Sequence, residues 1–255
     1  FSYGQLLGLG YTAATIRSDR KEGRIERLRR GWYIPKSEVD PRERHVQLIR
    51  ATLTQMHPDS VLSHESAGII HQLPLPTLDL ERASVTRSDP ALGHGRRTAA
   101  VHLRIAPLAA DDVVLHESFP VTSLARTAVD LARSLPYEWG VIVCDAALAK
   151  GLDRAELEEE VARGRRRRGN QVALRAVAFA DGRSGSPLES LSRVQFARLG
   201  LPTPELQFVV PGLNNPRVIS DFAWPELRTV GEADGRSKYD QLLQPGQTAS
   251  GVVMA

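Results

Sequence analysis

Three acidic residues near the end of the chain have the types and spacing of a divalent-cation site. Asp221 lies in one β-rich run, and Glu232 and Asp234 lie in the next. We expect these runs to form antiparallel strands, at 218–223 and 227–234. Because side chains alternate along a strand, Glu232 and Asp234 should share a face. Carboxylates gathered on one face repel unless a cation or proton lies between them, and Mg²⁺ or Mn²⁺ prefers such oxygen ligands. The alternative is a solvated edge whose acids only end strands and begin turns.

A fourth acid, Glu189, lies at the start of an expected helix, at 187–199. The segment Ser186-Pro187-Leu188-Glu189 has the pattern of a capping box with Pro at the first helical position, in which Glu189 would bond to the amide of Ser186. On a helical wheel Glu189 also lies beside the buried face, where it could border the acidic group. Both a capping and a catalytic role remain open.

A basic helix near the N-terminus has the pattern of a DNA-contacting element. Thr12 is the expected N-cap of a helix that runs to about Glu22, after a first helix at 3–9 that ends at Gly10. The sequence then predicts a hairpin at 25–34. The basic residues on the helix and hairpin that could follow a phosphate backbone are Arg17, Arg20, Lys21, Arg24, Arg27, Arg29 and Arg30. The alternative is a charged solvent face used for protein contact.

The N-terminal segments resemble a family of bacterial regulators. Leu7 to Thr12, the basic helix and Leu28 to Tyr33 look like the winged-helix domain of AbiEi-type antitoxins, and the segments 61–67 and 120–132 also match proteins of this architecture. The resemblance covers nearly the whole chain. It implies DNA binding, transcriptional autoregulation and a toxin protein as a partner.

The C-terminal acids resemble the PD-(D/E)XK nuclease pattern, and most closely the subgroup near very-short-patch repair endonucleases that has E-x-D-G in place of E-x-K. The resemblance matches Asp221 to the first acid and Glu232 to the second, and Asp234 stands where the usual Lys orients water. Lys238 is the candidate to replace that Lys, and Glu189 would be the acid on the helix. The implied cofactor is Mg²⁺ or Mn²⁺, held by Asp221, Glu232 and Asp234.

The element pattern predicts an α+β protein with three domains. We expect a winged helix-turn-helix at 1–40, a mixed α/β middle domain with a helical linker at 41–180, and a restriction-endonuclease-like α/β/α domain at 181–255. Other expected elements are strands at 83–86 and 101–105, a helix at 123–135, and a helix that begins after a capping box at Asp153. The last domain is expected to be incomplete, because the final residues have the pattern of a new helix.

Composition is that of a globular protein. The 255 residues are 42% hydrophobic and 25% charged, with a net charge of +3. The lone Cys144 excludes an internal disulfide and a thiolate zinc site. With no apolar run of roughly 18 residues and no signal-peptide pattern, we expect a soluble, cytoplasmic protein without a membrane partner.

Two other signals have simpler interpretations. His64 and His71 are seven residues apart on an expected helix, but no third ligand is in view, which favours packing or surface roles over a metal site. The run 165–168 consists of four arginines, and a solvated helix end is favoured over a nucleic-acid contact.

Two functional hypotheses follow from the sequence. The first is a DNA-binding protein with a metal-dependent endonuclease-like domain that acts on phosphodiesters. The second is a non-enzymatic repressor or antitoxin of a type IV toxin–antitoxin system, in which a degenerate nuclease fold only supports binding.

Overall fold

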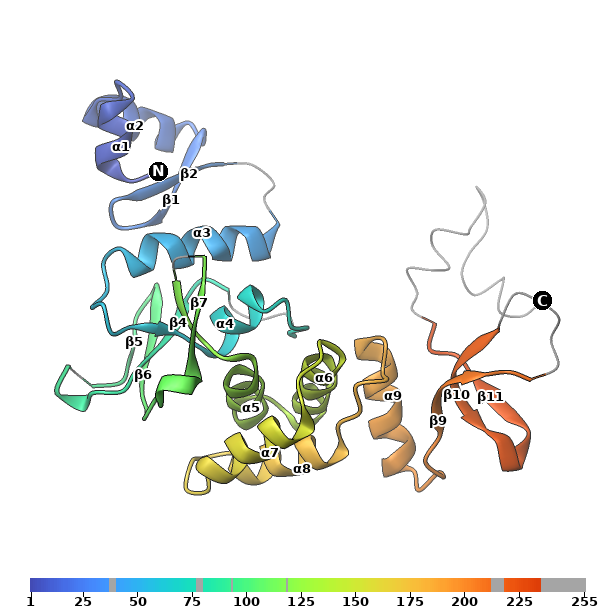
Figure 1. The fold of residues 1–255 in the computed structure, drawn as a ribbon. Coiled ribbons are helices and arrows are strands. Elements are labelled where there is room, and N and C mark those ends of the chain that lie inside the picture. Colours follow the sequence, from blue (N-terminus) through green and yellow to red (C-terminus); the bar gives the residue numbers. More distant parts are fainter. Residues whose placement is uncertain (37–39, 77–79, 93, 118, 212–217, 235–255) are drawn as a thin grey trace, which may run out of the picture. The chain divides into compact units, whose positions relative to one another are not determined.

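The computed structural model describes residues 1–36, 40–76, 80–92, 94–117, 119–211 and 218–234 (Figure 1). It is a mixed α and β structure that divides into two units, Phe1–Ser134 and Leu135–Ala255. This division falls at a different place from the three expected domains. Within the described ranges, no helix has the length and apolar character needed to cross a membrane.

The first unit begins with two short helices and an antiparallel hairpin. These elements are α1 (Tyr3–Gly8), α2 (Ala13–Lys21), β1 (Ile25–Arg29) and β2 (Trp32–Pro35). The Thr12 side chain accepts a hydrogen bond from the Thr15 amide, which confirms Thr12 as the N-cap of α2. Gly10 adopts a left-handed φ of 87°, a conformation that favours glycine and that ends the first helix before the chain turns.

The rest of the first unit is a mixed sheet with helices. Its strands are in the spatial order β5-β6-β4-β3-β8-β7. The elements after the hairpin are α3 (Pro41–Leu53), β3 (Val61–Leu62), α4 (His64–Ile70), β4 (Ala83–Arg87), β5 (Arg96–Arg97), β6 (Val101–Ile105), β7 (Val113–His116), β8 (Phe119–Thr122) and α5 (Leu124–Ser134). The strands β4 and β6 and the helix α5 confirm three of the sequence predictions.

The core of the first unit lies between α3 and one face of the sheet. Ile49 of α3 packs with alternate residues of the strands, because those residues point to the same face. The buried cluster is Ile49, Leu62, Ala67, Ala83, Val85, Val101, Leu103 and Val121. The residues between them, such as Ser84 and His102, therefore point to the opposite face.

The second unit contains helices followed by a small antiparallel sheet. Its elements are α6 (Tyr137–Ala149), α7 (Arg154–Arg163), α8 (Asn170–Phe179), α9 (Pro187–Arg198), β9 (Glu205–Val209), β10 (Ile219–Trp224) and β11 (Thr229–Gly231). Asp153 and Glu156 form the expected capping box of α7. The Arg165–Arg168 run lies in the turn after α7 and not in the helix itself.

The sheet of the second unit has the order β11-β10-β9. The antiparallel pairing of β10 and β11 confirms the sequence prediction. Helix α9 packs on this sheet through Phe196, whose ring meets those of Phe222 and Trp224 edge-on at 5.2 and 5.3 Å. The predicted strand at 227–234 is wrong in extent, because the residues around Pro225 form a 3-10 turn and β11 covers only three residues.

Candidate functional site

Helix α9 is positioned by a buried ion pair. Arg193 Nη1 lies 2.7 Å from Asp145 Oδ2 of α6, and its other amino group donates to the Phe179 carbonyl at 2.8 Å. Burial raises the pKa of Asp145, and the Arg193 charge opposes that rise. The pair fixes the rotation of α9, and Glu189, one helical turn before Arg193, is fixed with it.

Glu189 is almost fully buried at the N-terminus of α9. The Ser186 side chain accepts from the Glu189 amide, as a helix N-cap does, while Glu189 Oε2 accepts from the Gly185 amide at 2.8 Å. The predicted capping box is therefore only half formed: Ser186 caps the helix, but the predicted bond from the Ser186 amide to Glu189 is wrong, because the Gly185 amide donates instead. The carboxylate thus caps the chain beside the helix and still has oxygen atoms that face β9.

Asp221 lies on β10 directly across from Gln207 on β9. The flanking register pairs Phe208 with Ser220 and Leu206 with Phe222, which places Gln207 and Asp221 opposite one another on the same face. The Gln207 amide Nε2 lies 3.1 Å from Glu189 Oε2 and 3.4 Å from Asp221 Oδ1. Gln207 also has a φ of 52°, a left-handed conformation that is uncommon for a strand residue. Its amide therefore links the helix acid to the strand acid.

Glu232 lies next to Asp221 after β11 ends. The backbone amide of Ala233 donates to Asp221 Oδ2 at 2.8 Å, which holds the segment after β11 against β10. The pKa of Glu232 is raised by desolvation first, and then by the negative charges of Asp221 and Asp234. Like charges are therefore close together here, and their repulsion disfavours the ionised form of Glu232.

We call Glu189, Gln207, Asp221 and Glu232 the acidic edge. The structure brings together three of the predicted acids, from α9, β10 and the segment after β11. The expected shared face of Glu232 and Asp234 on one strand is wrong, because the strand ends at Gly231 and both acids follow it. Asp234 still influences Glu232, and Lys238 lies outside the described residues.

The donor chemistry of the acidic edge suits a hard divalent cation. Mg²⁺ usually retains several waters and binds proteins through one or two carboxylates, a requirement that Asp221 and Glu232 can meet. In the part of the chain that the structure describes, no group of three or more His, Cys, Asp or Glu side chains is arranged to hold a metal ion. A cation here would therefore rely on two carboxylates and water.

The basic residues of α2 and the hairpin have different surroundings. Arg17, Arg20, Lys21, Arg27 and Arg30 are exposed. Arg24 is exposed as well, but it is paired with Asp19 and Glu22. Arg29 is half-buried, and its Nη1 lies 3.5 Å from the Ala51 carbonyl of α3. The predicted cationic stripe thus has exposed members on α2, while Arg24 and Arg29 already have intramolecular partners.

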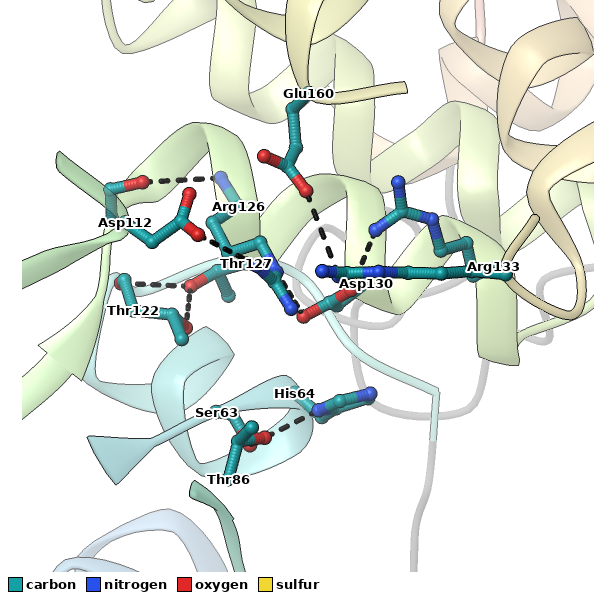
Figure 2. Close-up of polar contacts among 12 residues, drawn as sticks. Ser63, His64, Thr86, Asp112, Thr122, Arg126, Thr127, Asp130, Arg133 and Glu160 are labelled. Carbon is teal, nitrogen blue, oxygen red and sulfur yellow. Dashed lines mark hydrogen bonds and ion pairs between the residues drawn. The ribbon is translucent and has the colours of Figure 1, made fainter. Parts of the chain in front are cut away.

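A buried ionic network in the first unit was not predicted from the sequence (Figure 2). Arg126 of α5 lies between two acids, with Nε at 2.7 Å from Asp130 Oδ2 and Nη1 at 2.9 Å from Asp112 Oδ2. Arg133 also pairs with Asp130 at 2.8 Å. An Arg and an Asp four residues apart within an apolar helix were the available signal, because that spacing places them on one face.

His64 lies at the start of α4, with a left-handed φ of 49°. Its Nδ1 lies 3.1 Å from the hydroxyl oxygen of Ser63, which in turn accepts a hydrogen bond from Thr86 (Figure 2). Burial lowers the pKa of His64 to about 4, although Asp130 opposes that shift. His64 is therefore neutral near pH 7, and the described contacts of His64 and His71 agree with packing roles.

Two proteins of Mycobacterium tuberculosis are similar to part of this chain. They are the uncharacterized proteins MT2308 of strain CDC 1551 and Rv2248 of strain H37Rv, each 41% identical to this chain over 112 residues. The match covers 44% of this chain and 41% of each relative. No protein-family model matches the sequence.

Proposed function

We propose that this chain binds DNA and that its acidic edge is a metal-dependent endonuclease-type site that acts on phosphodiesters. The observation that carries the proposal is the convergence of Glu189, Asp221 and Glu232 from three separate elements. Such a gathering of like charges costs stability and is typical of functional sites. A toxin partner, which the resemblance to AbiEi-type proteins implies, and a cytoplasmic location, which the lone cysteine fits, are parts of the same proposal.

The chain's own residues would have separate roles at the acidic edge. Asp221 and Glu232 would hold the cation, Mg²⁺ or Mn²⁺, which when bound polarises a phosphate and lowers the pKa of water. Glu189 would accept a proton or orient water beside them. Gln207 holds Glu189 and Asp221 at a fixed separation, because its single amide group donates to both.

The DNA-binding part of the proposal rests on α1, α2 and the β1–β2 hairpin, which have the order of a winged helix. Arg17, Arg20 and Lys21 are exposed on α2, and Arg27 and Arg30 are exposed on the hairpin. A helix in the major groove with a hairpin beside the neighbouring strand would bring both sets of cations to the phosphate backbone.

A second function is favoured by one specific observation. The oxygens of Asp221 already accept hydrogen bonds from the Gln207 amide and the Ala233 backbone, so the acidic edge is internally hydrogen-bonded. This arrangement supports a non-enzymatic repressor or antitoxin, in which the edge only stabilises the fold. Metal-dependent cleavage distinguishes the two functions.

The test is cleavage of supercoiled plasmid by the full chain with and without millimolar Mn²⁺. We expect nicking with Mn²⁺ by the wild type, loss of nicking in Asp221→Asn, and wild-type nicking in Glu226→Gln, which removes an exposed acid of the nearby 3-10 turn. DNA binding without any cleavage by folded wild-type protein would favour the repressor. Equal cleavage by Asp221→Asn would place the activity elsewhere or in a contaminant.

A further inference from the structure

The β5–β6 end of the sheet in the first unit gathers arginines around a histidine. Strand β5 pairs with β6 so that Arg97 lies opposite His102 and Arg96 lies opposite Leu103. Cross-strand partners share a face, so Arg97 and His102 are on one face while Arg96 is on the other. Arg104, two residues after His102, shares the face of Arg97.

A third arginine reaches the same place from the residue just before β4. Arg82 Nε donates to the Thr98 carbonyl at 2.9 Å. The Thr98 amide donates to the Val101 carbonyl at 2.8 Å, so Thr98 is held beside the beginning of β6. The guanidinium of Arg82 is thereby fixed next to the Arg97–His102 pair. We call Arg82, Arg97, His102 and Arg104 the cationic cluster.

Arg104 has fewer partners than a buried guanidinium normally has. Its Nη2 lies 3.7 Å from Glu65 Oε2, beyond hydrogen-bond reach, and that same oxygen accepts from Ser84 Oγ at 2.6 Å. Among the described residues, its buried Nη1 has no hydrogen-bond partner. Nη1 itself is closed to solvent, whereas the side chain as a whole keeps 21% of its surface exposed. Burial lowers the pKa of Arg104, and a nearby anion would offset that cost.

The electrostatic potential at His102 is made more positive by three neighbouring arginines, which favours the binding of an anion. Burial lowers the pKa of His102 most, and the positive charges of Arg104, Arg97 and Arg82 lower it further. Glu65 acts in the opposite direction. His102 is thus a probe of the charge balance within the cluster, because any anion that binds there must raise its pKa.

We propose that the cationic cluster binds a phosphate group. Arginine is suited to this ligand, because its planar guanidinium donates two parallel hydrogen bonds to phosphate oxygens. Arg104 and Arg97 would contact the phosphate from β6 and β5, and Arg82 would contribute from the edge. This site is independent of the acidic edge and of α2, so it stands or fails separately from the proposed function.

The test is NMR titration of the histidine side chains in the full chain with inorganic phosphate at constant ionic strength. We expect phosphate to move the titration midpoint of His102 to higher pH, while exposed His57 serves as the internal reference. A short DNA duplex in place of phosphate distinguishes a backbone phosphodiester from a free phosphate, and a His102 response that depends on Arg97 supports the site in either case.

Matched variants separate a site from a general charge effect. Arg97→Gln and Arg96→Gln remove the same charge from adjacent exposed residues of β5, but only Arg97 shares the face of His102. We expect the phosphate response to be lost in Arg97→Gln and in Arg104→Gln, and kept in Arg96→Gln. Absence of a response in the wild type, or equal loss in both β5 variants, overturns the proposal. Arg97 is exposed, so its variant keeps the test decisive if Arg104→Gln fails to fold.

Discussion

The Arg126 network and the acidic edge arrange charge in opposite ways. Around Arg126, each buried acid has a guanidinium within 3 Å, and a further bond joins Arg126 to a backbone carbonyl. At the acidic edge, Asp221 and Glu232 are neighbours of the same sign, and an amide group bridges Asp221 to a third acid. Opposite charges neutralise one another in the first region. In the second region, a cation or a proton is needed to relieve the repulsion between like charges. We expect the first region to serve stability, whereas binding at the second region is part of the proposed function.

The largest expected effect comes from breaking the compensated region. Arg126→Met should lower the free energy of unfolding by about 3–5 kcal/mol, because Asp112 and Asp130 would stay buried with their main partner removed. Arg44→Met is the matched control. It breaks a partly exposed pair with Glu26, for which we expect a loss of about 0–1 kcal/mol. Urea unfolding measures both, and equal losses would show that the buried network stabilises no more than a surface pair.

A smaller effect is expected from relieving the uncompensated region. Because the pKa of Glu232 is raised, its folded form binds a proton more tightly than the unfolded chain does, and stability is lost as pH rises through that pKa. Asp221→Asn removes the main neighbouring charge, so the metal-free variant should be as stable as the wild type or more stable above that pH. Thermal unfolding across pH 4 to 8 measures this difference.

Binding of a divalent cation should stabilise the acidic edge, which gives a further test of its uncompensated charge. A cation at 100 times its Kd stabilises the folded state by about 2.7 kcal/mol, so millimolar Mn²⁺ should raise the Tm of the wild type and raise that of Asp221→Asn much less. Glu226→Gln should respond like the wild type. If Mn²⁺ does not change the Tm of the wild type, the acidic edge is a structural feature and not a metal site.

Local patterns in the sequence predicted those parts of the structure that local interactions determine. Thr12, Asp153 and Ser186 each cap a helix as expected, because a side chain and a nearby amide suffice for a cap. The pairing of β10 with β11 follows from a short turn between two β-rich runs. The predicted end of the last strand, at residue 234, was wrong. Nothing in a run of strand-forming residues marks where hydrogen bonding to β10 stops.

Contacts between distant residues could not be predicted in the same way. Arg126 and Asp112 form an ion pair although they are 14 residues apart in the sequence, and Arg193 and Asp145 do so at a separation of 48 residues. Gln207 was missed because its role depends on the register of β9 with β10, which places it across from Asp221. A neutral glutamine has no charge pattern in the sequence that indicates a site. The three acids were predicted because their residue type and spacing are typical of a divalent-cation site.

The smallest expected effect is on DNA binding by the basic residues in and next to helix α2. It compares a cation that has acidic partners with cations that have none among the described residues. Arg24 is held by Asp19 and Glu22, whereas Arg17 and Lys21 are exposed and have no acidic partner among the described residues. Cations that bind phosphate release counterions, so the dependence of log affinity on log salt reports how many phosphates are neutralised. Arg17→Ala with Lys21→Ala should weaken binding to duplexes of any sequence and reduce the salt slope by about one for each phosphate no longer neutralised. Arg24→Gln should leave the slope unchanged, because that guanidinium is already occupied. Duplex binding measured by fluorescence anisotropy from about 50 to 200 mM salt tests both expectations. If the folded double variant keeps the wild-type affinity and slope, α2 is not the DNA-binding face.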